Sequence, residues 1–278
     1  MRWLSGMLLA LAVTMFTACS PAEREEIQAP ERGVTQASLE RETTPPCQLT
    51  LGFESWEPYQ YLSAGGEAGG VDIEIAKRAL SHMNCTLRAQ QGSWMELIEW
   101  IQNGDIDFVM GASRTEARDE YALFSVPYRD EQFSLFVRGD RMSRYDQDSV
   151  EEFLAAGFRV GTVNEYYYGE ELQNLMYESE YTTQFVGAML NELNVARLLD
   201  GEIDGFLEDN LVAASMIRRR GLGAFIDRHE ISLPATEVYV MFSKESVDES
   251  QVEEFNDALQ VLLDEGFIDH VMSRYSVY

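Results

Sequence analysis

The chain has 278 residues, of which 45% are hydrophobic and 11% aromatic, and this composition supports packed cores and excludes global disorder. The length exceeds one minimal domain and suits two lobes of ordinary size. The formal net charge of −27 argues against nucleic acid, and against binding of the folded body to an anionic membrane, because like charges repel. The charge favours either cationic ligands or simple solubility.

The first residues predict a targeting segment. Arg2 supplies a positive charge, and residues 7–16 form an apolar run that is too short for a membrane span of about 20 residues. Phe-Thr-Ala-Cys at residues 16–19 resembles a bacterial lipobox, although phenylalanine stands where leucine is usual. We therefore expect residues 1–19 to be a lipoprotein-type signal peptide. Lipid on Cys19 would then anchor the protein in the periplasm and be its only link to the membrane.

Residues 20–46 are rich in Glu, Arg, Pro, Thr, Gln and Ser and contain almost no large apolar side chains. This composition predicts a disordered tether between the anchor and the folded body. Folded structure is expected to begin near Cys47.

If Cys19 carries lipid, two cysteines remain, Cys47 and Cys85. An even number of remaining cysteines in an oxidising compartment favours a disulfide. The two residues open the first and second expected strands, whose N-terminal ends lie level when a right-handed βαβ unit places them side by side. We expect a Cys47–Cys85 bridge; the alternative is two buried free thiols.

From Cys47 onward short apolar runs alternate with helical patterns. The expected elements of this half are a strand at 49–53, a helix over 71–83, a strand at 86–89, a helix over 94–102, a strand at 106–111 and an extended crossing segment at 132–137. Asp72 stands where a helix cap would, and Asn103-Gly104 ends a helix. Strands that alternate with helices predict a parallel sheet covered on both faces.

The same plan recurs in the second half of the chain. The expected elements are a strand at 158–163, helices over 170–177, 189–200 and 210–219, strands at 183–186 and 203–207, a return strand at 237–243 and closing helices within 248–275. Asp200-Gly201 precedes one of these strands as Asn103-Gly104 precedes another. The repetition predicts a second α/β lobe.

The region 49–137, with its aromatic-proline loop after the first strand and Ser-Arg-Thr-Glu-Ala-Arg at 113–118, resembles bacterial extracytoplasmic solute-binding proteins of family 3, which bind amino acids for ABC importers. The resemblance implies an α/β, two-lobed periplasmic-binding-protein type II (flytrap) fold. Each lobe would be a mainly parallel sheet flanked by helices, and two strands would form the hinge. It assigns residues 47–136 plus 240–278 to lobe 1 and residues 137–239 to lobe 2.

The resemblance also implies a carboxylate site after the strand at 106–111. The backbone at Gly111, the hydroxyl of Ser113 and the guanidinium of Arg118 would receive the α-carboxylate of a ligand, which suits arginine because its planar fork binds a carboxylate with two hydrogen bonds. Asp209 would take the α-ammonium from the other lobe. The alternatives are a surface salt bridge from Arg118 and a purely helix-capping Asp209.

The loop after the first strand would complete the site, since ligands of open α/β sheets bind outside the carboxyl ends of strands. By resemblance Glu54 is its acidic residue and Trp56 its stacking aromatic, with Tyr59 close by; the alternative is that Trp56 or Tyr59 only packs the loop. Asn-Glu-Tyr-Tyr-Tyr-Gly at 164–169 departs from the small Gly-Ser/Thr turn of the family. We expect Glu165 and Tyr166 to face the ligand, either serving a cationic or aromatic ligand or filling the space.

The leading prediction is a monomeric binding protein that captures an amino acid or a related small carboxylate, with an ABC permease of the inner membrane as partner and no cofactor or metal. The first alternative is a ligand-sensing or envelope-interaction protein on the same fold. The second is an enzyme similar to cyclohexadienyl dehydratase, with Glu165 or Glu208 as the acid. Against an enzyme, the three histidines are isolated, and no Ser-His-Asp set, metal-ligand spacing or Gly-rich phosphate loop is present.

Overall fold

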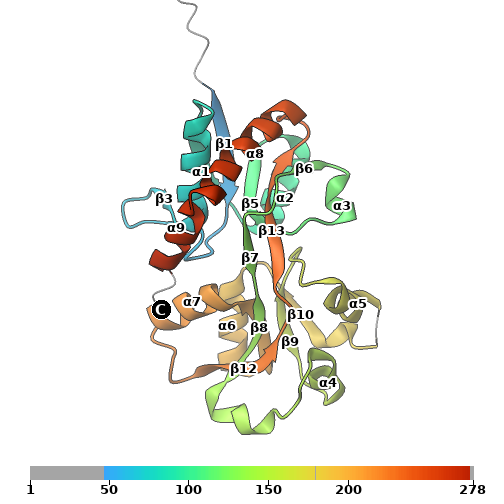
Figure 1. Ribbon diagram of the computed structural model, residues 1–278. Helices are drawn as coiled ribbons and strands as arrows, with labels where there is room; N and C mark the ends of the chain where they lie inside the picture. Colours follow the sequence, from blue (N-terminus) through green and yellow to red (C-terminus); the bar gives the residue numbers. More distant parts are fainter. Residues whose placement is uncertain (1–46, 179, 276–278) are drawn as a thin grey trace, which may run out of the picture. The chain divides into compact units, whose positions relative to one another are not determined.

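A computed structural model of the chain describes residues 47–178 and 180–275 (Figure 1). Two mixed β-sheets flanked by helices make up most of this part of the chain, which confirms the predicted fold class. A small third sheet pairs β2 (Tyr61–Leu62) with β3 (Ala68–Gly69). The expectations for the signal peptide, for lipid on Cys19 and for the tether lie outside the described residues. Within the described ranges, no helix is both long and apolar enough to cross a membrane.

The first sheet contains the start of the described chain and a strand from its end. Its strand order is β4-β1-β5-β13-β6, and β7 pairs with β13. The bounds are β1 (Gln48–Phe53), β4 (Thr86–Gln91), β5 (Phe108–Ala112), β6 (Ala122–Phe124), β7 (Arg129–Glu131) and β13 (Thr236–Ser243). β1 runs parallel to β4 and β5, whereas β13 is antiparallel to β5, β6 and β7. We call this sheet and its helices the first lobe.

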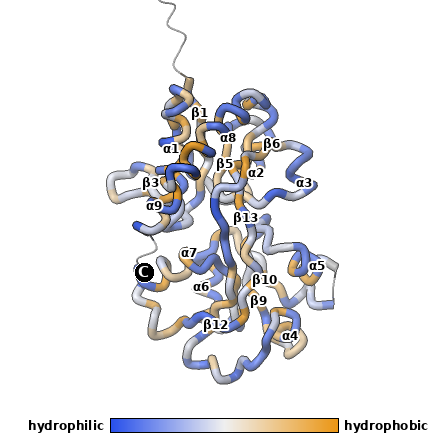
Figure 2. The backbone as a smooth tube through the Cα atoms, in the orientation of Figure 1, coloured by the Kyte–Doolittle hydropathy of each residue, from blue (hydrophilic) through white to orange (hydrophobic). Residues whose placement is uncertain are grey.

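Helices cover both faces of the first sheet. They are α1 (Val71–His82), α2 (Trp94–Asn103), the short α3 (Glu116–Asp119), α8 (Glu249–Asp264) and α9 (Phe267–Tyr275). Phe108 of β5 packs in the core that contains α1, α8 and α9, whereas the next residue, Val109, packs against α2. Successive side chains of a strand point to opposite faces, so β5 is buried on both sides. Figure 2 shows hydrophobic residues along the central strands and in patches on these helices.

Two of the predicted helix ends are confirmed, and one predicted helix cap is wrong. α2 ends at Gly104 (φ 75°), and α6 (Asn191–Asp200) ends at Gly201 (φ 76°), both in the left-handed conformation that glycine adopts without strain. Asp72 does not cap α1: the residue at that position is Gly70, and no side chain caps the helix. Asp72 lies in the first turn of α1, where its carboxylate binds Arg129 instead.

The second sheet has the order β10-β9-β11-β8-β12. Its strands are β8 (Phe133–Arg138), β9 (Val160–Val163), β10 (Phe185–Ala188), β11 (Gly205–Asp209) and β12 (Ile226–Ser232). β9 runs parallel to β10 and β11, and β8 is antiparallel to β11 and β12. The segment expected to cross between lobes at 132–137 is thus mostly a strand of this sheet. We call the sheet and its helices the second lobe.

The helices of the second lobe are α4 (Val150–Ala155), α5 (Glu170–Glu178), α6 and α7 (Asn210–Arg219), with 3-10 turns η1 (Gly139–Arg144) and η2 (Thr182–Gln184). Residues of α6 and α7 share one core with Phe136 and Phe206 of the sheet. The strand expected at 183–186 begins at Phe185, because η2 takes up the residues before it. The helix α4 and the strand β12 were not predicted.

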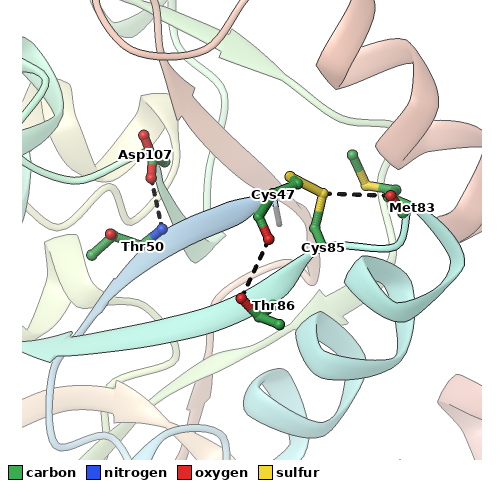
Figure 3. The surroundings of a disulfide bond; sticks show 6 residues. All are labelled: Cys47, Thr50, Met83, Cys85, Thr86 and Asp107. Atoms are coloured by element: carbon green, nitrogen blue, oxygen red, sulfur yellow. Dashed lines mark hydrogen bonds between the residues drawn. A yellow bond between two sulfur atoms is a disulfide. The ribbon is translucent and has the colours of Figure 1, made fainter. Parts of the chain in front are cut away.

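The disulfide between Cys47 and Cys85 is confirmed (Figure 3). Gln48 of β1 pairs in parallel register with Thr86 of β4, so the residues just before the two strands lie level. The amide of Thr86 donates to the carbonyl of Cys47 at 2.8 Å. The bridge therefore fastens the outer strand β4 to β1 where the described chain begins.

Replacing both cysteines by serine is expected to lower the free energy of unfolding by about 4 kcal/mol, because the bridge closes a loop of 38 residues in the unfolded chain. Urea denaturation of the double variant beside the unaltered protein measures the difference. A loss below about 1 kcal/mol would contradict the expectation.

Candidate functional site

A small cavity lies where residues of both lobes meet. Its volume is about 30 Å³, which holds no more than about two water molecules. Its lining residues are Glu54, Trp56, Gln60, Trp94, Met110, Gly111, Ser113, Arg118, Glu131, Phe133, Tyr166 and Tyr167. Six of the predicted ligand-binding residues are in this set, from the ends of β1, β5 and β9, as expected for an open α/β sheet.

Arg118 is buried and bound to two backbone carbonyls. The Thr115 hydroxyl caps α3 by accepting from the Arg118 amide at 3.2 Å, and this positions the side chain. Its Nη1 donates to the carbonyl of Ser113 and its Nη2 to the carbonyl of Glu165, each at 2.8 Å. Burial lowers the pKa of Arg118 from its usual value, yet a guanidinium stays charged in proteins. The alternative of a surface salt bridge is therefore wrong.

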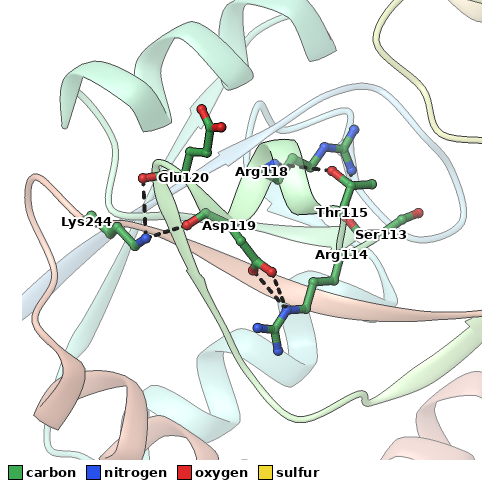
Figure 4. Close-up of polar contacts among 7 residues, drawn as sticks. All are labelled: Ser113, Arg114, Thr115, Arg118, Asp119, Glu120 and Lys244. Carbon is green, nitrogen blue, oxygen red and sulfur yellow. Dashed lines mark hydrogen bonds and ion pairs between the residues drawn. The ribbon is translucent and has the colours of Figure 1, made fainter.

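Arg114 provides a contrast within the same segment. It is exposed and pairs with Asp119, with 2.9 Å between Nε and Oδ1. Figure 4 shows Arg114 turned toward Asp119, whereas Arg118 points away from this pair. The segment thus separates one solvent-exposed arginine from one arginine that reaches the cavity.

Aromatic side chains form most of the wall beside Arg118. The Arg118 guanidinium lies 5.4 Å from the ring centroid of Trp94. Tyr166 is edge-on to both indoles, at centroid distances of 6.4 Å from Trp56 and 6.0 Å from Trp94. Its hydroxyl donates to the Glu54 carboxylate. We call the space bounded by Trp56, Trp94 and Phe133, which the Tyr166 ring occupies, the aromatic slot.

Glu165 meets the first lobe through its backbone and not through its side chain. Its carbonyl accepts from Nε1 of Trp94 at 3.0 Å as well as from Arg118. The side chain is exposed, contrary to the expectation that it faces the ligand. The residue has φ 64°, in the left-handed region that non-glycine residues adopt at a cost of about 1–2 kcal/mol. This conformation presents the carbonyl to the first lobe.

The cavity is more acidic than the sequence predicted. Glu131, at the end of β7, lines it and accepts from the Ser113 hydroxyl at 3.5 Å. Burial raises the pKa of Glu131 to about 8 and that of Glu54 to about 7. Among the described residues no group of three His, Cys, Asp or Glu side chains is placed to hold a metal ion. Sequence reasoning missed Glu131 because no motif surrounds it.

A buried ion pair lies next to the residues that line the cavity. Nε of Arg129 is 3.2 Å from Oδ1 of Asp72, and the guanidinium stacks on Tyr59, 3.8 Å from the ring centroid. Gln60, a lining residue, donates to Asp72 at 2.9 Å. Tyr59, one of the predicted ligand-binding residues, thus packs beneath Arg129 and does not line the cavity.

Asp209 and Glu208 end β11 on the side of the second lobe. Asp209 caps α7, accepting from the amides of Leu211 at 2.9 Å and Val212 at 3.1 Å, and it is not among the lining residues. Glu208 is 1% exposed and accepts from Nε1 of Trp56 at 3.2 Å. Burial raises the pKa of Glu208 to about 8. Its contact with Trp56 links the two lobes.

Known proteins resemble this chain in sequence and in fold. It is 24% identical over 222 residues, 78% of each chain, to a probable histidine-binding protein of Neisseria gonorrhoeae. An ancestral arginine-binding protein bound to arginine matches with a TM-score of 0.72 and 19% identity, over 82% of this chain and 98% of that one. A histidine kinase sensor domain with similarity to periplasmic binding proteins matches with a TM-score of 0.72 and 18% identity, over 83% and 96%.

At these identities the two structural matches establish the fold alone. The family model of bacterial extracellular solute-binding proteins, family 3, matches residues 49–277, almost the whole part of the chain that the structure describes. The named relative and the arginine-bound structure are binding proteins and not enzymes. The chain therefore belongs to family 3 of the bacterial extracellular solute-binding proteins.

Proposed function

We propose that this protein captures an amino acid with a cationic side chain between its two lobes. The observation that carries the proposal is the composition of one cavity, which Arg118 lines together with Glu54, Trp56 and Trp94. Arg118 can bind a carboxylate, and Glu54 can bind a cation. An amino acid with a distal positive charge carries both groups on one small molecule.

The carboxylate end of the site rests on Arg118 and the hydroxyl of Ser113. A bidentate arginine–carboxylate pair is stronger than bonds from the same guanidinium to neutral carbonyls, which are its partners now. The α-ammonium would face Glu131 and Asp209. Burial is the main cause of the raised pKa of Glu131, and the negative charge of nearby Asp209 raises it further. Asp209 would keep its capping role through Oδ1 and offer Oδ2, which now accepts from the Gln132 amide at 3.4 Å.

The side-chain end of the site rests on the aromatic slot. Trp faces attract cations by about 0.5–2 kcal/mol, depending on how well water is excluded. Trp56 is 5% exposed and Trp94 7% exposed, so the slot is largely dry. A guanidinium, imidazolium or ammonium in the slot would reach Glu54, which now accepts from Tyr166. The sequence relative points the same way, since it is a probable histidine-binding protein.

The captured amino acid would be delivered to an ABC permease of the inner membrane, with lipid on Cys19 as the tether. Residues 47–136 plus 240–278 and residues 137–239 would then be the two lobes that close on the ligand. A ligand that contacts both lobes stabilises the closed form by its differential affinity for it. We place import before sensing because the likeness to a kinase sensor domain concerns the fold alone.

Glu54→Gln tests the cationic class of the ligand. The variant is expected to bind L-arginine at least tenfold more weakly than the unaltered protein, because a charge-assisted bond is replaced by a neutral one. Calorimetric titration with L-arginine and L-histidine measures the change, with L-leucine as the neutral comparison. Unchanged affinity for both cationic amino acids would contradict the assignment of Glu54.

A further inference from the structure

We propose that Glu165 and Tyr166 occupy the ligand's place as an internal substitute, so that a ligand binds only by displacing Tyr166 from the aromatic slot. This inference rests on the proposed function, and it makes Tyr166 a residue that determines both affinity and specificity. It follows from three features of the described residues: the contacts of the dipeptide, the division of the cavity and the backbone of Glu165.

The contacts of this dipeptide match those proposed for an amino acid, group by group. The Glu165 carbonyl accepts from Arg118 at 2.8 Å, where a ligand's carboxylate oxygen would. The Tyr166 ring is edge-on to Trp56 and Trp94, where a ligand's side chain would lie. The Tyr166 hydroxyl donates to Glu54, where a distal cation would. In the dipeptide and in the proposed ligand alike, a hydrogen-bond acceptor is followed by an apolar group and then by a distal hydrogen-bond donor.

The side chain of Tyr166 also divides the available space. The inner cavity holds about 30 Å³, and a second cavity of about 290 Å³ lies beside it. Both are lined by Arg118, Tyr166 and Tyr167. The inner cavity is far smaller than the roughly 300 Å³ at which small-molecule sites begin, and the second cavity is close to that size but does not include Glu54 in its lining. Withdrawal of the Tyr166 ring would join them into one site that Arg118 and Glu54 both face.

The exchange has contributions of both signs. Displacement breaks the hydrogen bond from Tyr166 to Glu54 and the bonds from Trp94 and Arg118 to the Glu165 carbonyl. It also releases Glu165 from its strained left-handed backbone conformation. A cationic ligand replaces the neutral donor on Glu54 with a charged one, which is the stronger bond. A neutral aliphatic amino acid has no donor for Glu54 and would leave that buried carboxyl with only the backbone hydrogen bond from Trp94.

The measured affinity then includes the cost of emptying the slot. When only a fraction of the free molecules is competent to bind, the apparent dissociation constant rises by the inverse of that fraction. Tyr166→Ala removes the competitor, and its dissociation constant for L-arginine is expected to be about tenfold lower than that of the unaltered protein. That gain corresponds to a slot that is vacant in about one free molecule in ten.

Calorimetric titration of the full chain with L-arginine provides the test. Tyr166→Phe keeps the ring but loses the donor to Glu54, and it is expected to bind about threefold tighter, an intermediate gain. Phe225→Ala is the control, because this aromatic residue of the second lobe is 54% exposed and lines neither cavity. Weaker or equal binding by both Tyr166 variants would overturn the inference and leave the proposed function standing.

Small-angle X-ray scattering of the ligand-free proteins separates the two hypotheses. If neither the unaltered protein nor Tyr166→Ala binds L-arginine or L-histidine, the proposed function fails, and scattering alone decides the inference. A larger radius of gyration for Tyr166→Ala than for the unaltered protein and Phe225→Ala would support Tyr166 as the residue that holds the lobes together. Equal radii for all three would overturn that role.

Discussion

Replacing Arg118 by alanine is expected to weaken the binding of L-arginine at least 100-fold, by about 3 kcal/mol or more. Among the residues that the structure describes, Arg118 is the one cation that lines the cavity, and Nη1 and Nη2 of its guanidinium face the point where we place the ligand's carboxylate. Alanine leaves that carboxylate to the Ser113 hydroxyl and nearby amides alone. Calorimetric titration of the variant with L-arginine measures the loss.

Arg114→Ala is the matched control for this experiment. It removes the same side chain four residues earlier, where the guanidinium is exposed and pairs with Asp119 (Figure 4). Such surface pairs contribute about 0–1 kcal/mol, so both affinity and stability should remain nearly unchanged. If the two variants bind L-arginine equally well, Arg118 does not hold the ligand's carboxylate.

The second large effect expected is a loss of stability as the pH rises from 6 to 9. Burial raises the pKa of Glu54 to about 7 and those of Glu131 and Glu208 to about 8, whereas unfolded glutamates titrate near 4.5. In this pH range the folded protein binds more protons than the unfolded chain, so its free energy of unfolding decreases with pH. The stabilisation is complete below about pH 4.5 and is lost as the pH rises through 7–8. Between pH 6 and pH 9 the loss is on the order of 5 kcal/mol.

Urea denaturation at pH 6 and pH 9 measures this loss, and Glu131→Gln identifies one of its sources. Glutamine does not ionise, so the variant should lose less stability than the unaltered protein between the two pH values. Glu253→Gln, on the exposed surface of α8, is the control and should follow the unaltered protein. A free energy of unfolding that is the same at both pH values would show that these carboxyls do not remain protonated in the folded state.

The positions of Gly111, Ser113 and Arg118 beside the cavity could be predicted from the sequence, because local structure determines them. Strand β5 is a continuous apolar run, and Thr115 caps the short helix that carries Arg118. The spacing between these features places Arg118 at the carboxyl end of the strand. The same holds for the disulfide, since parallel pairing of β1 and β4 brings Cys47 and Cys85 level.

The acidic side of the site depends on long-range packing, which a sequence pattern does not contain. Trp94 reads as the first residue of an amphipathic helix, yet its indole donates to Glu165, 71 residues away. Glu131 has no flanking motif, and Glu208 reaches Trp56 across 152 residues. The sequence shows that residues 166–168 are bulky and aromatic. It does not show that Tyr166 bonds to Glu54, because that contact forms only when the two lobes pack together.

The most direct test of the central claim is a thermal-shift panel of the purified protein with the L-amino acids, polyamines, aromatic acids and small carboxylates. A ligand at a hundredfold over its dissociation constant adds about 2.7 kcal/mol, which raises the melting temperature by about 5 °C or more for a protein of this size. We expect the largest shifts with L-arginine, L-lysine or L-histidine and none with polyamines, which lack a carboxylate for Arg118. Shifts confined to neutral or acidic compounds, or to polyamines, would contradict capture of a cationic amino acid.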